Sequence, residues 1–161
     1  MLRSQSGLTH IEVVIVVVML VILAGITVSA ANLLNSALVA GRAKGASDQL
    51  ASAIRYTRQR AISEARDYCI ATRTAGGAGE YQVYTGGRTG TTCTGSSVEG
   101  PFTLTGDATV TDVALRFTPI STVDPVGPTD VGVTSSRLGV SCTVIVTVTP
   151  EGGIQIPGTS C

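Results

Sequence analysis

A long apolar run near the N-terminus, with one carboxylate at its start, constrains this chain more than any other feature. From Val13 to Gly41 there is no charged side chain, and the stretch from Ile11 to Ala31 is dominated by Val, Ile, Leu, Met and Ala. A helix of this length can cross the hydrocarbon core of a bilayer, which is about 30 Å thick. A carboxylate inside such a span costs about 2 to 3 kcal/mol, so Glu12 is predicted to have a function and a partner.

A secretory signal peptide is the alternative interpretation of the same run. Arg3 would then supply the positive region, and Val28-Ser29-Ala30 would be the small-residue cleavage site. Against this, the run is longer than a usual signal-peptide core, it opens with an acid, and its helical pattern continues past that site. We therefore expect residues 8–41 to remain in the mature protein as a transmembrane and assembly segment.

The residues ahead of the run resemble the class III signal of type IV pilins and type II secretion pseudopilins. The matching elements are Gly7, Glu12 and the apolar run that follows. The resemblance implies that a prepilin peptidase removes residues 1–7 by cutting between Gly7 and Leu8, and that the new N-terminus at Leu8 is methylated. The family's first mature residue is most often Phe, so Leu8 departs from the pattern.

The same resemblance implies a location and a set of partners. Such a subunit lies in the bacterial inner membrane with its N-terminus cytoplasmic and its β domain periplasmic, and then enters a periplasmic or extracellular fibre. Its partners would be the prepilin peptidase, an inner-membrane assembly platform and other pilin or pseudopilin subunits. In assembly, Glu12 would approach the α-amino group of a neighbouring subunit, since opposite charges attract strongly in a low-dielectric setting.

Helical periodicity continues beyond the apolar run. Apolar residues keep recurring at helical spacing, with Arg and polar residues between them, and no proline occurs before Pro101. The sequence predicts one helix from Leu8 to about Ala65. Its amphipathic half, over residues 42–66, is expected to lay a narrow apolar stripe on the soluble domain.

After Asp67 the helical period gives way to short Thr- and Val-rich segments separated by Gly, which is typical of strands and hairpin turns. The best strand candidates are residues 68–73, 81–85, 109–117, 142–149 and 153–157. The stretches 89–100 and 118–133 are expected to be exposed loops. The sequence therefore predicts an α+β, pilin-like fold, in which the long N-terminal helix packs on a small antiparallel β-sheet or β-sandwich over residues 67–161.

This soluble part resembles the GspH/FimT branch of pseudopilins and minor pilins, which have a long helix under a small β-sandwich. The likeness rests on the helical segment 50–62 running into a strand at Tyr68, the strand-like segment 113–118, and a last hairpin with Gly152-Gly153 at its turn. It implies a structural minor pilin or pseudopilin subunit. Such a subunit assembles through its N-terminal helix into a type IV pilus or a type II secretion pseudopilus.

Charge is unevenly distributed, although the formal net charge of the chain is +0 at pH 7. From Arg42 to Arg73, seven basic residues face three acids, a net of +4; from Thr74 onward, three basic residues face seven acids, a net of −4. A solvated basic helix face, or ion pairs with acids of the same or a neighbouring subunit, explains this pattern without a further ligand.

The alternative to a purely structural role is a FimT-like minor pilin that contacts DNA during uptake. The candidate contacts are Arg55, Arg58, Arg60 and Arg66. In that group, DNA binding is attributed to basic residues towards the C-terminus, whereas this chain has no Lys or Arg after Arg137. Phosphate contacts need basic side chains, so we rank nucleic acid below pilin subunits as a partner.

Four cysteines follow the apolar run, in a part of the chain expected outside the cytoplasm, where disulfides persist. They are Cys69, Cys93, Cys142 and Cys161, and they allow three pairings. If the last hairpin places Thr149 opposite Ile154, then Cys142 faces Cys161 at a separation compatible with a bridge. Cys69 and Cys93 then pair by elimination. Because no CxxC motif occurs, a redox motif or zinc ribbon is disfavoured.

Candidate catalytic and metal-binding groups are scarce. The only histidine, His10, lies at the start of the apolar run, which argues against His-dependent triads and His-bearing metal sites in the soluble domain. Asp124 and Asp130 could contribute to a calcium site, but they lack the EF-hand series and are better explained as turn residues. We therefore expect no enzymatic activity, no metal and no cofactor.

Overall fold

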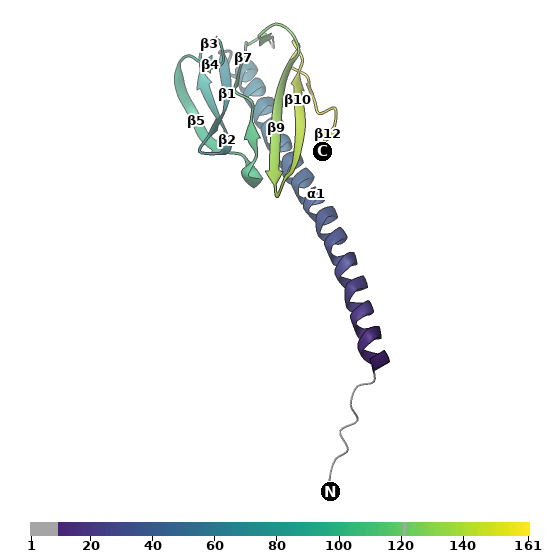
Figure 1. Cartoon of the computed structure of the whole chain (residues 1–161). Helices are drawn as coiled ribbons and strands as arrows, with labels where there is room; N and C mark the ends of the chain where they lie inside the picture. The colour runs from purple at the N-terminus through teal and green to yellow at the C-terminus, as the bar shows by residue number, and fades with distance from the viewer. Residues whose placement is uncertain (1–9, 121) are drawn as a thin grey trace. The chain divides into compact units, whose positions relative to one another are not determined.

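The computed structural model describes residues 10–120 and 122–161, and describes residues 26–32 by their backbone alone. Helix α1 spans His10–Ser63, and the strands follow it (Figure 1). Contacts divide the chain into two compact units; the first ends at Asn35 and the second is Ser36–Cys161. Gly7 and Leu8, where the leader peptide was predicted to end, lie outside the described residues.

The strands of the second unit are short. In chain order they are β1 (Tyr68–Ala75), β2 (Ala78–Thr85), β3 (Arg88–Thr89), β4 (Thr92–Cys93), β5 (Ser96–Thr103), β6 (Thr109–Val110), β7 (Val113–Phe117), β8 (Val123–Asp124), β9 (Thr129–Arg137), β10 (Val140–Val148), β11 (Ile154–Gln155) and β12 (Thr159–Ser160). A single 3-10 turn, η1 (Thr105–Asp107), separates β5 from β6.

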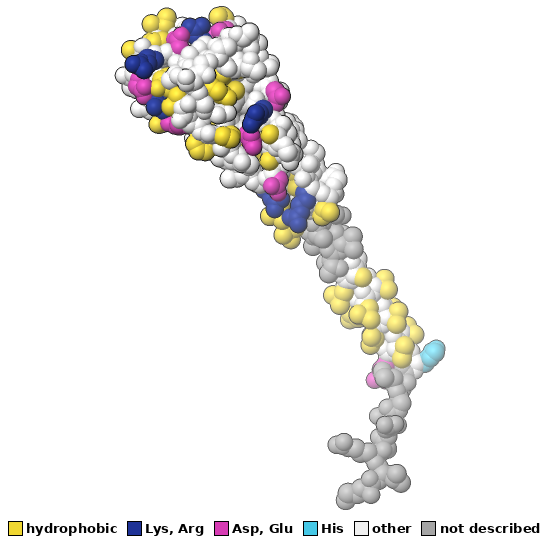
Figure 2. All heavy atoms as spheres, turned by 90° about the vertical axis from the view of Figure 1, so that its left-hand side faces the viewer, with side chains coloured by type: hydrophobic (Ala, Val, Ile, Leu, Met, Phe, Trp, Pro, Cys, Tyr) yellow, Lys and Arg dark blue, Asp and Glu magenta, His cyan; other side chains and the backbone are white. Residues whose placement is uncertain are grey.

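In the first unit, the described part of α1 is apolar on all sides. Every large apolar side chain from Ile11 to Leu23 is between 46% and 68% exposed, and hydrophobic side chains cover the face of this segment shown in Figure 2. A helix without a polar face is typical of segments that are buried in apolar surroundings. Within the described residues, however, no helix has an apolar stretch long enough to span a membrane, so the span over residues 8–41 stays a prediction.

In the second unit, one stripe of α1 is buried. Its members are Val39, Ala43, Ala46, Ser47, Leu50, Ala51, Ile54, Thr57 and Ala61. The two hydroxyl side chains are satisfied locally, since Ser47 donates to the carbonyl of Lys44 and Thr57 donates to the carbonyl of Ala53.

Two antiparallel sheets pack with this stripe. The first has the order β5-β2-β1-β7-β8, and the second has the order β11-β10-β9-β6, with β12 also paired to β10. Alternate residues of β10 are buried, which places Cys142, Val144, Val146 and Val148 on the inner face. Leu50 of α1, Ile70 of the first sheet and Val146 of the second belong to one core cluster. The predicted α+β architecture, a long N-terminal helix packed on antiparallel β-sheets, is therefore confirmed.

Two predicted loops contain strands instead. The stretch 89–100 holds β3, β4 and the start of β5, and the stretch 118–133 holds β8 and the start of β9. β5 is an edge strand whose side chains are nearly all exposed, so it has no alternation of apolar and polar residues to reveal it. β9 does alternate, with Val131 and Val133 buried, but Gly and Thr between the valines weaken the signal.

The strand predicted over residues 109–117 is wrong in a different way, because it is two strands in two sheets. β6 pairs with β9 of the second sheet, whereas β7 pairs with β1 of the first. The chain crosses between the sheets at Thr111 and Asp112, where it is exposed. A continuous β pattern cannot show such a crossing.

α1 ends two residues earlier than predicted, in a C-cap that is unusual for its sequence. The amide of Arg66 donates to the carbonyl of Ala61 at 3.2 Å, and Ala65 has a φ of 50°. This hydrogen bond is that of a Schellman motif, in which the left-handed position is most often Gly. Ala65 therefore occupies a conformation that a Cβ disfavours.

Candidate functional site

Glu12 is the one predicted assembly residue that the structure describes. It lies in the first turn of α1, it is exposed, and its neighbours in the first unit are apolar. A carboxylate in the first turn is favoured by the helix dipole. Its proposed role towards a neighbouring subunit stays a prediction, as do cleavage after Gly7 and methylation at Leu8.

The four arginines suggested as a DNA-binding surface have different environments. Arg60 is turned into a polar network between α1, β1 and β5, and Arg58 donates to the carbonyl of Gly152 at 3.0 Å. Arg55 and Arg66 are exposed. Two of the four guanidinium groups are thus already committed to hydrogen bonds within the subunit.

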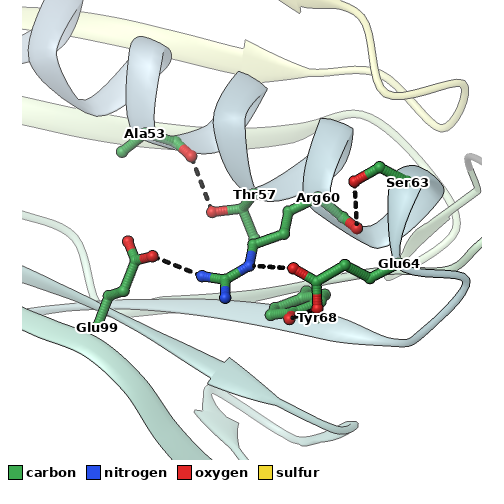
Figure 3. A network of polar contacts seen from close by, with 7 residues as sticks. All are labelled: Ala53, Thr57, Arg60, Ser63, Glu64, Tyr68 and Glu99. Atoms are coloured by element: carbon green, nitrogen blue, oxygen red, sulfur yellow. Dashed lines mark hydrogen bonds and ion pairs between the residues drawn. The ribbon is translucent and has the colours of Figure 1, made fainter.

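The Arg60 network joins three elements (Figure 3). Arg60 Nε donates to Glu64 Oε1 at 2.7 Å, and its terminal nitrogen donates to Glu99 Oε1 of β5 at 2.5 Å. The hydroxyl of Tyr68, the first residue of β1, donates to Glu64 Oε2 at 2.5 Å. The guanidinium carbon of Arg60 also lies 5.1 Å from the centre of the Tyr68 ring, within cation–π range.

The contacts of this network hold Arg60, Glu64 and Tyr68 in their ordinary charge states. The hydrogen bond from Tyr68, and then that from Arg60, lowers the pKa of Glu64. The hydrogen bond to Glu64 raises the pKa of Arg60. Burial, and then the hydrogen bond to Glu64, raises the pKa of Tyr68. At neutral pH the network is therefore an ion pair with a neutral phenol, which suits a structural joint rather than an acid or base catalyst.

Arg58 fixes the turn between β10 and β11. Gly152 is buried with a φ of 76°, and a Cβ added there would lie 2.5 Å from Arg58 Nε. Arg55 and Arg58 line a shallow hollow of about 380 Å³ along α1, together with Gln59, Ile62 and Ser63. Arg66 does not line it, so the candidate DNA contacts do not form one continuous basic groove.

Two disulfides close the second unit. Cys69 is bonded to Cys93, with their Cα atoms 5.7 Å apart, and Cys142 is bonded to Cys161, with their Cα atoms 4.2 Å apart. These are the pairs named from the sequence. The first ties the β3–β4 hairpin to β1, and the second ties the C-terminus to β10.

The register argument for the last hairpin was wrong by one residue near the turn. Val148, not Thr149, pairs with Ile154, whereas further along Val144 pairs with Thr159. Between those two pairs the returning chain therefore contains one more residue than β10 does. The extra residue is absorbed in the segment 156–158, which lies outside any strand and brings Cys161 level with Cys142.

The two aspartates considered for calcium have protein partners. Asp124 accepts from Arg88 at 3.1 Å, and Asp130 accepts from the hydroxyl of Thr147 at 2.6 Å. In the described part of the chain, no group of three or more His, Cys, Asp or Glu residues is placed to hold a metal ion.

No protein-family model and no curated protein matches this chain. Among solved structures, the type IV minor pilin FimU of Pseudomonas aeruginosa is similar in two crystal forms. In space group P21 the match covers 73% of this chain and 90% of that chain, at 18% sequence identity and a TM-score of 0.50. In space group P65 it covers 71% and 92%, at 19% identity and a TM-score of 0.47.

This chain has the type IV pilin fold. At such low identity the similarity concerns the fold alone. Within this pilin fold, sequence reasoning missed Glu99, which lies in a stretch predicted to be a loop and carries no signal of its own. The Arg60–Glu64 pair could have been found, because the two residues are four apart on a predicted helix.

Proposed function

We propose that this protein is a structural subunit, a minor pilin or pseudopilin, which assembles through its N-terminal helix into a type IV pilus or a type II secretion pseudopilus. The observation that carries the proposal is a helix apolar on all sides with Glu12 in its first turn, in a chain whose second unit has strands arranged as in pilins. An all-apolar helix needs lipid or like helices around it. The GspH/FimT-like branch is the one that the sequence favours.

Maturation is the first step of the proposed function. A prepilin peptidase in the bacterial inner membrane cuts after Gly7, and the α-amino group of Leu8 becomes methylated. The mature helix remains in the membrane with its second unit on the periplasmic side. The two disulfides support that side, because disulfides persist outside the cytoplasm.

Glu12 sets the axial register in the second step. In an apolar setting, the Glu12 carboxylate of one subunit and the Leu8 amine of its neighbour attract each other strongly. A wrong axial offset leaves both charges without a partner, and an unpaired charge in such a setting costs several kcal/mol. The pair therefore selects one register more than it adds net stability.

The test compares Glu12→Gln with a matched control, Asp48→Asn, which neutralises an exposed acid of the second unit. A photo-crosslinking amino acid at Leu20 reports helix neighbours in intact bacterial membranes. Mass spectrometry of the extracted protein reports cleavage after Gly7 and methylation of Leu8.

We expect Glu12→Gln to be inserted, cleaved and methylated as usual but to lose cross-links to fibre subunits, while Asp48→Asn keeps them. Cross-linking of Glu12→Gln at the control level would show that its charge does not guide assembly. A mature N-terminus at Ala31 instead of Leu8 would overturn the anchor and the assembly role together.

A further inference from the structure

The outer face of the first sheet carries a hollow that neither the core nor the proposed assembly uses. Strand pairing places side chains there in three rows across β2, β1 and β7. One row holds Tyr84, Cys69 and Arg116, the next holds Gln82, Ala71 and Ala114, and the third holds Glu80 and Arg73. The middle row is low at Ala71, a small residue that lines both hollows, and its partner on β7, Ala114, is buried.

Two adjoining hollows lie over this floor and share Ala71, Arg73 and Tyr84 as lining residues. The larger has a volume of about 400 Å³, which lies within the usual range of small-molecule sites. The smaller, of about 30 Å³, extends it towards Gln82 and Pro101. We call the two together the outer groove.

Tyr84 gives the outer groove an aromatic wall. Its hydroxyl donates to Gln82 Oε1 at 2.7 Å, and Gln82 Nε2 donates in turn to the hydroxyl of Ser97 at 2.7 Å. Because Tyr84 and Gln82 are two residues apart on the same face of β2, this bond holds the phenol along the strand. The ring is thereby fixed beside the alanine floor, half-buried, as part of the lining of both hollows.

Hydrogen-bonding groups surround the ring on the remaining sides. Arg73 forms an ion pair with Glu80 at 3.1 Å, and Asp112 accepts from the amide of Thr74 at 3.1 Å. Thr91 and Thr92 also line the larger hollow, on the hairpin that the Cys69–Cys93 disulfide ties down, and the Thr92 hydroxyl donates to the carbonyl of Thr89. The outer groove therefore offers donors and acceptors in roughly equal measure next to an apolar ring.

Charge and backbone pairing narrow the class of ligand. The charged residues that line the outer groove are one guanidinium, Arg73, and two carboxylates, Glu80 and Asp112, so this lining has a net charge of −1 and disfavours anions. β1 is paired on both sides, to β2 and β7, so no free strand edge is available there for an extended peptide. The aromatic ring and the hydrogen-bonding groups of the outer groove fit a neutral ligand that has an apolar face and many hydroxyl groups.

We propose that the outer groove is a binding site for neutral saccharides. A pyranose ring lies with its C–H face on Tyr84, and its hydroxyls pair with Arg73, Asp112 and the amide of Gln82. The subunit would then contact glycans through its second unit, a property independent of how its N-terminal helix assembles.

The experiment uses the full chain in dodecylphosphocholine micelles, a detergent without a sugar headgroup. The probes are cellotetraose, mannotetraose and chitotetraose, with tetragalacturonate as the anionic comparison, and binding is measured by saturation-transfer NMR and by calorimetry. Tyr84→Leu removes the aromatic wall, and Tyr56→Leu is the matched control, because Tyr56 is a 53% exposed tyrosine of α1 outside the outer groove.

At least one neutral tetrasaccharide should bind, with tetragalacturonate weaker, and Tyr84→Leu should reduce the affinity about tenfold while Tyr56→Leu leaves it unchanged. Arg73→Gln provides a second variant, since this side chain is 61% exposed and its loss spares the fold; it should also weaken binding. No binding of any neutral probe at about 10 mM, which corresponds to less than about 3 kcal/mol, overturns the proposal. Equal affinity in wild type, Tyr84→Leu and Arg73→Gln overturns it as well.

Discussion

The contact between Arg58 and Gly152 allows a sharp test of how α1 is fixed to the last hairpin. Gly152 and Gly139 both have a positive φ, with nearly equal values of 76° and 80°. A Cβ at Gly152 would lie 2.5 Å from Arg58 Nε, whereas a Cβ at Gly139 would meet nothing within 4 Å. Alanine at the two positions therefore carries the same backbone cost but differs in its steric consequence.

The expected loss in the free energy of unfolding has two parts, the backbone cost of alanine at a positive φ and the steric cost of displacing Arg58. Placing Ala at a positive φ costs about 1 kcal/mol, which is the whole expected effect of Gly139→Ala. Gly152→Ala adds the displacement of the Arg58 guanidinium and the loss of its hydrogen bond to the Gly152 carbonyl, worth about 1 kcal/mol for a half-buried pair. We expect about 2 kcal/mol of destabilisation for Gly152→Ala in total.

The assay is urea unfolding of the full chain in micelles, followed by circular dichroism, in a double-mutant cycle with Arg58→Ala. In the Arg58→Ala background, Gly152→Ala should cost about as much as Gly139→Ala, since only the backbone term remains. Equal costs for the two glycine variants in the wild-type background would refute the reasoning. An undiminished cost of Gly152→Ala without Arg58 would do the same.

Three further predictions concern the helix end, the Arg60 network and DNA. Ala65→Gly should raise the free energy of unfolding by about 1 kcal/mol, because it relieves a left-handed alanine in the C-cap; an unchanged or lower urea midpoint would contradict this. Folding lowers the pKa of the Glu64 carboxyl, so the ionised carboxylate stabilises the fold above the ordinary carboxyl pKa, and this stabilisation is lost as the pH falls through the lowered value. Glu64→Gln should therefore make the urea midpoint fall less steeply as the pH is lowered. An unchanged pH dependence in this variant would rule out the linkage. Duplex DNA should bind weakly or not at all at physiological salt in fluorescence anisotropy, because Arg58 and Arg60 are committed within the subunit; submicromolar, salt-sensitive affinity abolished by Arg55→Ala would restore the DNA-uptake role.

The sequence predicted the helix and the fold class because their signals are local and strong. The apolar stripe of α1 repeats over many turns, from Val39 to Ala61, and in β10 the buried residues Cys142, Val144, Val146 and Val148 alternate with more exposed ones. Long segments with a regular period predict one type of secondary structure, helix or strand, rather than both. The pairing of Cys142 with Cys161 followed from a hairpin argument of the same kind, although the register near the turn was off by one.

The features that the sequence did not predict depend on contacts between segments that are distant along the chain. β5 is recognisable only through its pairing with β2, and Glu99 gains a role only because β5 brings it to Arg60 of α1. The outer groove is still less visible in the sequence, since Tyr84 and Ala71 come from two strands and Asp112 comes from the connection that precedes β7. A regular spacing in the sequence cannot predict contacts between residues that meet only across a sheet.

The edges of the β-sheets have a consequence for a protein that is proposed to assemble with many like subunits. In the sheets of the described residues, β6 and β8 are edge strands of two residues each, and β10 is covered along its outer side by the two-residue strands β11 and β12. β5 is a long edge, but Pro101 interrupts its donors and its register with β2 shifts twice. Short edges, proline and irregular pairing all prevent one sheet from adding to another. In the proposed fibre, such edges disfavour pairing between the β-sheets of neighbouring copies.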